Sequence, residues 1–396
     1  MDFPGGRVPF ASALKFTGGS FQTQPPMDCY RTIDSYGVAV PGADVPHELS
    51  QDLAVRMYRS MVALQTLDTI FFESQRQGRF SFYMTSNGEE ATAIGSAAAL
   101  TLEDTVFSQY REQGVLMWRG FTLRQMADQC FGNERDSGKG RQMPVHYGSK
   151  ELNFHTISSP LATQLPQAVG AAYTLKLSRK PAVVAAYFGE GAASEGDFHA
   201  AANFACTLSA PVIFICRNNG WAISTPATEQ YRGDGIAGRG PSYGMATIRV
   251  DGGDARAVYN ATAQARKHAV ENQCPVMIEA MSYRSGHHST SDDSSRYRTT
   301  DEMKQWRARD PVMRFQRWLV QLKWWEEAQE QALRKALRKE VIEALDSAGK
   351  AAKPPLSEMF TDVYDELPWH LKEQQDEVLK HVALHPEACP SDMPVK

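Results

Sequence analysis

The sequence AVVAAYFGEG occupies residues 182–191, and PVIFICRNNG follows at residues 211–220. Each contains an apolar run with the length of one buried strand, and the alanine-rich segment between them, residues 194–208, has the length of a helix. Continuous apolar strands separated by a helix are typical of a parallel sheet that is covered on both faces. The same succession recurs over residues 247–280. The sequence therefore predicts an α/β fold, a doubly wound parallel sheet with helices on both faces.

The flanking sequence divides the chain into three expected parts. Residues 1–50 are rich in Gly and Pro and show little periodicity, which indicates an extended N-terminal arm. A helical pattern begins at Ser50, and Gly78 can end that helix. We expect the α/β domain to span residues 51–310 and a C-terminal helical region to span residues 311–396.

Composition excludes several classes of protein. The 396 residues carry 42 basic and 46 acidic side chains, so the net charge of −4 argues against a nucleic-acid partner. No apolar run approaches the roughly 18 residues that a membrane-spanning helix requires. The six cysteines contain no CxxC pair, which favours a reducing compartment over a disulfide scaffold. The opening residues, MDFP, have the pattern of neither a signal peptide nor an Arg-rich transit peptide.

Polar residues follow both apolar runs at the point where each predicted strand ends. Glu190 lies between Gly189 and Gly191 after the first run, and Asn219 follows the second. Ligands bind outside the carboxyl ends of parallel strands, and a carboxylate with an amide oxygen suits Mg²⁺. For Gly-Glu-Gly alone, a plain turn with glycine present for geometry is the better interpretation. The two motifs together favour a metal and phosphate site, because glycine permits close approach to a phosphate.

These motifs resemble a known family. The pair looks like the thiamin diphosphate motif, with Glu in place of the usual Asp. FGEGAASEG at 188–196, RNNGWAIS at 217–224 and GHHSTSDDS at 286–294 are similar to the alpha subunits of branched-chain 2-oxo acid dehydrogenases, also called 2-oxoisovalerate dehydrogenases. The resemblance extends from DFPG at 2–5 to FTDVYDELP at 360–368, nearly the whole chain. It implies the thiamin diphosphate-binding fold.

The resemblance implies a magnesium site and a cofactor site. Glu190, the Asn219 side chain and the Trp221 carbonyl are the implied ligands of Mg²⁺. Taken alone, Arg111 or Arg217 would be interpreted as a solvated surface charge. The resemblance instead implies that both contact the cofactor, because planar guanidinium groups suit a diphosphate. The residues implied to contact thiamin diphosphate are Tyr110, Arg111, Gly191, Ala192, Arg217 and His288.

The segment SSPLATQ at residues 158–164 resembles the potassium loop of the family. An ordinary Ser/Thr cap on the following helix is the alternative that the residues alone favour. The resemblance instead implies one K⁺ bound by the side chains of Ser158, Thr163 and Gln164 and by the Pro160 carbonyl. Gln109 and Leu161 are expected to border an apolar substrate pocket.

Residues 283–300 form a predicted loop rich in His, Ser, Asp and Arg. A flexible polar loop is the simpler interpretation of such a composition. By resemblance, His288 reaches the cofactor and is catalytic in acyl transfer to lipoamide. Ser289 and Thr299 stand where the family is phosphorylated, and a phosphate beside His288 adds about −1.5 to −2 charges.

The resemblance implies an oxidoreductase acting on 2-oxo acids with a disulfide acceptor, 3-methyl-2-oxobutanoate dehydrogenase (2-methylpropanoyl-transferring). It decarboxylates a branched-chain 2-oxo acid and passes the acyl group to a lipoyl group of the transacylase core. The family works as an α2β2 heterotetramer, with a catalytic carboxylate on the beta subunit and a regulatory kinase and phosphatase. The implied compartment is the mitochondrial matrix, and bacterial cytoplasm is the alternative.

Three other functions remain as alternatives. A pyruvate dehydrogenase alpha subunit would use the same cofactor for a smaller substrate. A nicotinamide-dependent reductase is disfavoured, because the motif at residues 189–194 lacks the third Gly of the dinucleotide fingerprint. A non-catalytic scaffold is disfavoured by the presence of Glu190, Asn219 and Arg217.

Overall fold

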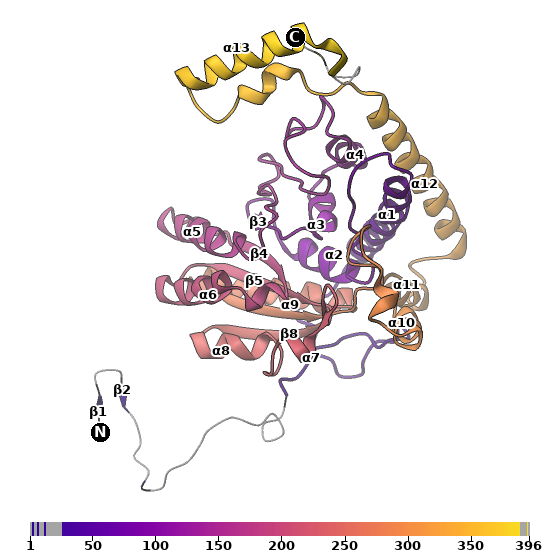
Figure 1. Ribbon diagram of the computed structural model, residues 1–396. Helices are drawn as coiled ribbons and strands as arrows, with labels where there is room; N and C mark the ends of the chain where they lie inside the picture. Colours follow the sequence, from indigo (N-terminus) through magenta and orange to yellow (C-terminus); the bar gives the residue numbers. More distant parts are fainter. Residues whose placement is uncertain (1, 4–5, 8–11, 13–25, 389–393, 395–396) are drawn as a thin grey trace.

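The computed structural model describes residues 2–3, 6–7, 12, 26–388 and 394. At its centre is a five-stranded sheet in which all neighbouring strands are parallel (Figure 1). Across the sheet, the strands are β3 (Thr105–Phe107), β4 (Val184–Gly189), β5 (Val212–Asn218), β9 (Val276–Met281) and β8 (Ala246–Asp251). β4 and β5 are adjacent, so their polar ends leave the sheet at the same edge.

The side chains of β4 alternate between two hydrophobic cores. Ala185 and Tyr187 lie in the core on one face of the sheet, while Ala186 and Phe188 lie in the core on the other face. A strand that is buried on both faces needs apolar residues at every position, which explains the continuous apolar run.

Helices cover both faces of the sheet. α5 (Gln164–Leu177) and α6 (Gly196–Leu208) pack in one core, and α2 (Glu90–Ala99) and α9 (Ala255–Asn272) pack in the other. The prediction of a doubly wound parallel α/β fold is therefore confirmed.

The long first helix packs mainly against other helices. α1 (Gln51–Arg76) starts after Ser50, whose hydroxyl accepts a hydrogen bond from the Leu53 amide at 3.3 Å. A third hydrophobic cluster packs α1 against α11 (Pro311–Gln321) and α12 (Glu327–Lys350), which belong to the predicted C-terminal helical region.

The remaining elements are shorter or lie at the margins. The helices are α3 (Gln113–Trp118), α4 (Leu123–Phe131), α7 (Ala227–Gln230), α8 (Gly240–Tyr243), α10 (Thr300–Arg307) and α13 (Trp369–Leu384). The short strands are β1 (Asp2–Phe3), β2 (Gly6–Arg7), β6 (Trp221–Ala222) and β7 (Thr225–Pro226). Single 3₁₀ turns are η2 (Ala192–Ser194), η3 (Ala237–Arg239), η4 (Ser294–Arg296), η5 (Leu356–Phe360) and η6 (Pro386–Ala388).

The described part of the N-terminal arm from residue 26 onward lies on the α/β domain. The Asp254 carboxylate, which also caps α9, accepts hydrogen bonds from the backbone amides of Thr32 and Ile33, both at 2.7 Å. Tyr30 pairs with Val250 at the edge of β8. Of the predicted arm before residue 26, only residues 2–3, 6–7 and 12 are described.

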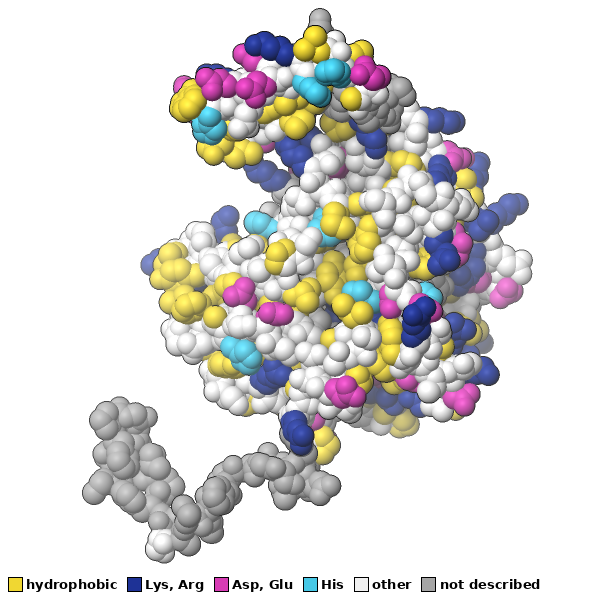
Figure 2. All heavy atoms as spheres, in the orientation of Figure 1, with side chains coloured by type: hydrophobic (Ala, Val, Ile, Leu, Met, Phe, Trp, Pro, Cys, Tyr) yellow, Lys and Arg dark blue, Asp and Glu magenta, His cyan; other side chains and the backbone are white. Residues whose placement is uncertain are grey.

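The C-terminal end of the chain forms an arm around α13 that extends beyond the α/β domain (Figure 1). Trp369 is 72% exposed and Leu384 is 74% exposed, and Figure 2 shows hydrophobic side chains along this arm. Large apolar side chains that remain in contact with water favour a partner that covers them.

Two predictions from composition can be compared with the described residues. None of the helices they form combines the length and apolar character needed to cross a membrane. The five cysteines among them, Cys29, Cys130, Cys206, Cys216 and Cys274, are free thiols.

Candidate functional site at the carboxyl ends of β4 and β5

The structure brings Glu190 and Asn219 together directly after β4 and β5. The backbone amide of Asn219 donates to Oε2 of Glu190 at 3.3 Å. The other carboxylate oxygen of Glu190 is buried and has no hydrogen-bond partner among the described residues. Burial, with a contribution from the nearby Glu89 carboxylate, raises the pKa of Glu190 to about 7. A buried carboxylate oxygen without a hydrogen-bond partner is the feature expected of a ligand to a cation.

The side-chain amide of Asn219 has two protein partners. Its Nδ2 donates to Oε1 of Glu89 at 2.6 Å, and its Oδ1 accepts from the backbone amide of Trp221 at 3.2 Å. The Trp221 carbonyl, the implied third ligand, accepts a long hydrogen bond of 3.4 Å from Arg284. Of the three implied magnesium ligands, Asn219 and Trp221 therefore lie on the segment after β5, and Glu190 lies on the segment after β4.

Arg217 lies at the centre of a buried ion cluster. Its Nη1 is 2.5 Å from Glu89, its Nε donates to Glu112, and its Nη2 has no partner among the described residues. Although burial works in the opposite direction, the Arg217 guanidinium holds the pKa of Glu89 below its usual value. Two nitrogens of Arg217 are thus occupied by protein carboxylates, which leaves Nη2 for a ligand.

Glu112 also holds the segment that carries three predicted site residues. Its Oε2 accepts from the backbone amides of Gln109 and Tyr110, both at 3.0 Å, and from the Ser108 hydroxyl at 2.5 Å. One buried carboxylate therefore fixes this segment to Arg217 and to the edge of the sheet.

His288 is held by two guanidinium groups. Arg111 donates from Nη2 to Nδ1 of His288 at 3.1 Å and to its carbonyl at 2.6 Å, and Arg284 lies 3.4 Å from the same Nδ1. Burial, followed by the charges of Arg111 and Arg284, lowers the pKa of His288 to about 3, so the imidazole is neutral near pH 7. Because guanidinium groups only donate, Nδ1 must accept, and the single ring proton resides on Nε2.

The loop around His288 is organised by internal hydrogen bonds. Asp292 accepts from the His288 amide at 2.7 Å and from the Tyr297 hydroxyl at 2.5 Å. The Arg298 guanidinium donates to the Gly286 carbonyl at 2.6 Å and also to the Arg284 carbonyl.

The two predicted phosphorylation positions differ in accessibility. Ser289 is 8% exposed, so its hydroxyl reaches a modifying enzyme only if the loop opens. Thr299 is exposed and caps α10, where its side chain accepts from the Glu302 amide at 3.2 Å.

Residues 158–164 have the geometry of a loop before α5. Thr163 stands at the N-cap position of α5 but makes no capping hydrogen bond; its hydroxyl donates to the Pro160 carbonyl at 3.2 Å. Gln164 is buried and donates from Nε2 to the Tyr187 carbonyl at 2.9 Å. Ser158 is exposed. The side-chain cap that the residues alone favoured is therefore absent at Thr163.

The residues expected at the substrate pocket have different environments. Gln109 is buried and accepts from the Gly189 amide at 2.6 Å, which places its amide group at the end of β4. Leu161 is 39% exposed. Tyr110 packs edge-on against His288 with ring centres 6.2 Å apart.

Close packing explains the small residues after Glu190. A Cβ atom on Gly191 would lie 2.7 Å from Cβ of Ala222, closer than real Cβ contacts allow. Ala192 is buried in η2. The segment after β4 and the segment after β5 thus approach each other only because residue 191 has no side chain.

Three further residues of this cluster were not predicted from the sequence: Glu89, Glu112 and Arg284. All three are buried charges that contact predicted site residues. The available signal for Glu89 was the sequence GEEA at 88–91, two acidic residues in front of a small apolar helix. Charged residues there require buried partners, which the sequence does not identify.

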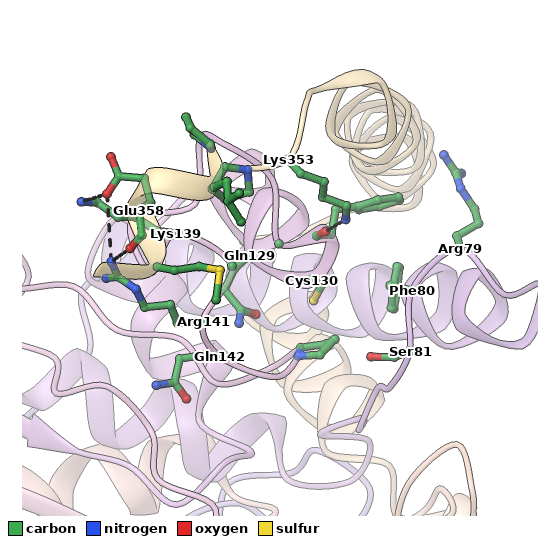
Figure 3. Close-up of a pocket in the computed structure, with 18 residues that line it drawn as sticks. Arg79, Phe80, Ser81, Gln129, Cys130, Lys139, Arg141, Gln142, Lys353 and Glu358 are labelled. Carbon is green, nitrogen blue, oxygen red and sulfur yellow. Dashed lines mark hydrogen bonds and ion pairs between the residues drawn. The ribbon is translucent and has the colours of Figure 1, made fainter. Parts of the chain in front are cut away.

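A separate hollow of about 670 Å³ lies between α4 and residues 353–359 (Figure 3). Its cationic groups already have partners. Lys139 is 2.5 Å from Glu358, Arg141 is 2.9 Å from Asp362, and Lys353 donates to the Phe131 carbonyl at 2.6 Å. This hollow therefore lacks the unpartnered groups that distinguish the site after β4 and β5.

Comparison with known proteins agrees with this geometry. Residues 58–357 match the family described as "Dehydrogenase E1 component". The chain is 53% identical over 396 residues to "2-oxoisovalerate dehydrogenase subunit alpha 2, mitochondrial" of Arabidopsis thaliana, covering 100% of this chain and 83% of the relative. It is 54% identical over 391 residues to the mitochondrial alpha subunit of the same enzyme of Homo sapiens, covering 98% and 87%. The corresponding protein of Dictyostelium discoideum is 57% identical over 364 residues, covering 91% and 82%.

Proposed function

The chain belongs to the dehydrogenase E1 component family, as an alpha subunit of the branched-chain 2-oxo acid dehydrogenase, and on this premise we propose its reaction and the roles of its residues. With thiamin diphosphate and Mg²⁺, it decarboxylates branched-chain 2-oxo acids and transfers the acyl group to a lipoyl group of a transacylase core. The observation that carries the proposal is the meeting of Glu190 and Asn219 beside the unpartnered Nη2 of Arg217.

The residues after β4 and β5 fit a metal-bound diphosphate. Glu190 offers an unpartnered acidic oxygen, and Arg217 offers an unpartnered cationic nitrogen. Oxygen ligands from Glu190, Asn219 and the Trp221 carbonyl suit Mg²⁺, which keeps its remaining positions for water and phosphate oxygens. Gly191 and Ala192 would approach the diphosphate through the backbone, and Tyr110 and Arg111 would contact it from the segment held by Glu112.

When bound, thiamin diphosphate supplies the electron sink that decarboxylation requires. The protein contributes orientation and charge. Arg217 and the metal would neutralise the diphosphate, and Gln109 and Leu161 would border the pocket for the branched side chain. The fixed amide of Gln109 at the end of β4 supports this assignment, since a buried polar group there has a defined direction.

We assign His288 to acyl transfer. Its neutral ring with the proton on Nε2 supports the role of a donor toward the sulfur of the incoming lipoyl group. Arg111 fixes this tautomer, so the side chain needs no reorganisation at the moment of transfer.

The segment from Ser158 to Gln164 is assigned to K⁺. The Thr163 hydroxyl and the Pro160 carbonyl are 3.2 Å apart, and the Gln164 amide is oriented by its hydrogen bond to Tyr187. These contacts support a cluster of oxygen donors before α5, to which Ser158 would add its hydroxyl.

Ser289 and Thr299 are assigned as targets of a regulatory kinase and phosphatase. A phosphate on Ser289 would place negative charge in a buried loop beside His288, and the loop would have to rearrange. A phosphate on Thr299 would lie at the N-terminus of α10, where negative charge is favourable.

The partner is a beta subunit, in an α2β2 heterotetramer that serves a lipoyl-bearing transacylase core. The relatives are named as alpha subunits, and the exposed apolar side chains around α13 support a covering partner. The relatives are also named as mitochondrial, which supports the mitochondrial matrix as the compartment.

Co-expression with a beta subunit tests the proposal. We expect the assembly to act on 3-methyl-2-oxobutanoate faster than on pyruvate, and the chain alone to have negligible activity. A preference for pyruvate would favour the pyruvate dehydrogenase alternative. Substantial turnover by the chain without a partner would contradict an active site that needs a carboxylate from the beta subunit.

A further inference from the structure

We propose that Glu89 is a positioning residue for the metal site, and that it acts by fixing which atom of the Asn219 side-chain amide faces the metal. The inference rests on the proposed function, because it concerns how Asn219 presents an oxygen to Mg²⁺. It assigns a role to a residue that is outside the implied ligand set.

The contact between Glu89 and Asn219 has only one chemically consistent direction. An ionised carboxylate paired with Arg217 can only accept, so the atom of Asn219 that lies 2.6 Å from Glu89 must be the nitrogen. The backbone amide of Trp221 can only donate, so the atom 3.2 Å from it must be the oxygen. Both contacts therefore select the same orientation of the amide.

This orientation leaves Asn219 ready to bind a metal. The Oδ1 atom has two lone pairs, and the Trp221 amide occupies one of them. The amide nitrogen, which cannot bind a metal ion as a neutral NH₂ group, faces away toward Glu89. Since the terminal torsion of asparagine has two broad minima, the short contact to Glu89 adds to the longer one from Trp221 in keeping the nitrogen from replacing the oxygen.

Glu89 is itself held rigidly. It is 1% exposed, it lies at the N-cap position of α2, and its backbone amide donates to the Ser86 carbonyl at 2.8 Å. Its second carboxylate oxygen is 2.5 Å from Nη1 of Arg217. The same arginine that offers Nη2 to the diphosphate thus anchors the acceptor that orients the metal ligand, which couples the two halves of the site.

The test compares Mn²⁺ binding by the full-length chain co-expressed with a beta subunit, at saturating thiamin diphosphate, by electron paramagnetic resonance of free Mn²⁺. The variants are Glu89→Gln, Asn219→Asp and the double variant. Because partners that orient a ligand typically contribute 10- to 100-fold to metal affinity, we expect Glu89→Gln to weaken Mn²⁺ binding by about that factor. Asn219→Asp should also weaken it, because two carboxylates would then face each other.

The double variant gives the decisive comparison. A carboxylate at position 219 presents oxygen in either orientation, and an amide at position 89 can donate to it. Glu89→Gln should therefore improve Mn²⁺ binding when it is added to Asn219→Asp, while it impairs binding when Asn219 is kept. A merely structural Glu89 would cost affinity in both backgrounds. Unchanged Mn²⁺ binding by Glu89→Gln, or tighter binding by Asn219→Asp alone, would overturn the inference; the second outcome applies even if Glu89→Gln does not fold.

Glu112→Gln is the matched control. It removes the other carboxylate partner of Arg217 without touching Asn219. We expect its effect on Mn²⁺ binding to have the same sign in both backgrounds, and a sign reversal like that of Glu89→Gln would count against the inference. If the unaltered assembly binds no Mn²⁺ with thiamin diphosphate, the proposed function itself fails; if it binds and the variants match it, only the role of Glu89 fails.

Discussion

Arg111 donates to Nδ1 of His288 at 3.1 Å, and this contact leaves Nε2 as the ring nitrogen that carries the proton. The imidazole has a pKa of about 3 because it is buried and lies beside Arg111 and Arg284. The imidazole is therefore neutral near pH 7, with Nε2 as its only donor. A histidine in this state acts as a fixed hydrogen-bond donor whose charge does not follow pH.

The tautomer predicts how substitutions of His288 differ. Glutamine places an amide nitrogen near the position of Nε2, whereas asparagine places one near Nδ1, so His288→Gln should keep more acyl transfer than His288→Asn. Both should lose part of the roughly 10²- to 10⁴-fold that a positioned proton donor contributes. Acylation of a lipoyl domain measures the effect, and decarboxylation with an artificial electron acceptor is the control. Equal loss in the two variants would contradict the assignment of the proton to Nε2.

Replacing the acidic group of Glu190 with an amide should strongly weaken metal-dependent cofactor binding. We expect Glu190→Gln to weaken binding of thiamin diphosphate with Mg²⁺ by roughly 100-fold or more, as the loss of a direct ligand exceeds the loss of an orienting partner. Calorimetry with Mg²⁺, and with a chelator in place of it, measures this. Glu195→Gln, an exposed carboxylate on the same segment, should leave binding unchanged. Similar cofactor affinities for the unaltered chain, Glu190→Gln and Glu195→Gln would contradict the assignment of Glu190 as a metal ligand.

Substitution of Gly191 should separate the segments after β4 and β5. The added Cβ of Gly191→Ala would lie 2.7 Å from Cβ of Ala222, and overpacking of this kind costs about 1–3 kcal/mol. We expect cofactor affinity to fall by about tenfold or more, since about 1.4 kcal/mol corresponds to a factor of ten. Gly196→Ala is the control, because a Cβ there meets no atom within 4 Å. Cofactor binding by Gly191→Ala that equals the control would show that the two segments tolerate separation.

Asp68 predicts an unusual pH dependence of stability. Burial raises the pKa of Asp68 from 3.8 to about 6, although Ser86, Tyr83 and Gln113 donate to it. In the unfolded chain the group stays ionised until about pH 4, so the folded state alone takes up a proton as pH falls from about 6 to 4. This contribution to the free energy of unfolding therefore increases by about 3 kcal/mol on acidification, two pKa units at about 1.4 kcal/mol each.

The check is the difference in melting temperature between the unaltered chain and Asp68→Asn at pH 7 and pH 5. The melting temperature of the unaltered chain should rise relative to that of Asp68→Asn on going from pH 7 to pH 5, because only the unaltered chain has the titrating carboxyl at position 68. A difference that is the same at both pH values would show that Asp68 has an ordinary pKa in the folded state.

The two phosphorylation positions should respond differently to a negative charge. Ser289 is nearly buried beside His288, so Ser289→Glu should abolish or strongly reduce turnover, while Ser289→Ala should not. Thr299→Glu places charge at the exposed N-terminus of α10 and should have a much smaller effect. Turnover of the assembled enzyme measures both, and full activity of Ser289→Glu would contradict the proposed control by phosphate.

The sequence predicted those parts of the fold that local patterns encode. The apolar runs of β4 and β5 reflect burial on both faces, and Ser50 marks the start of α1 through its own hydroxyl. The approach of Asn219 to Glu190 followed from the rule that parallel strands end at one edge. These predictions depend on residues that are close in sequence or on the geometry of one sheet.

The buried charges around the site could not be predicted in this way. Glu89 contacts Arg217 and Asn219 across about 130 residues of sequence, and nothing near Glu89 reveals these partners. The alternative of a flexible loop around His288 was likewise open, because the hydrogen bonds of Arg298 and Asp292 to that loop depend on its folded path. Long-range polar pairing is a property of the tertiary structure, which composition and periodicity do not encode.

The bond between Thr32 and Asp254 has a consequence for how this polypeptide is made. The two residues are 222 positions apart in the sequence. At about 5–20 residues per second, a ribosome therefore adds Thr32 roughly 10 to 45 seconds before it adds Asp254. Through that interval the nascent N-terminal segment has no native acceptor for these amides. A chain that ends before Asp254 would therefore lack the acceptor that holds the Thr32 and Ile33 amides.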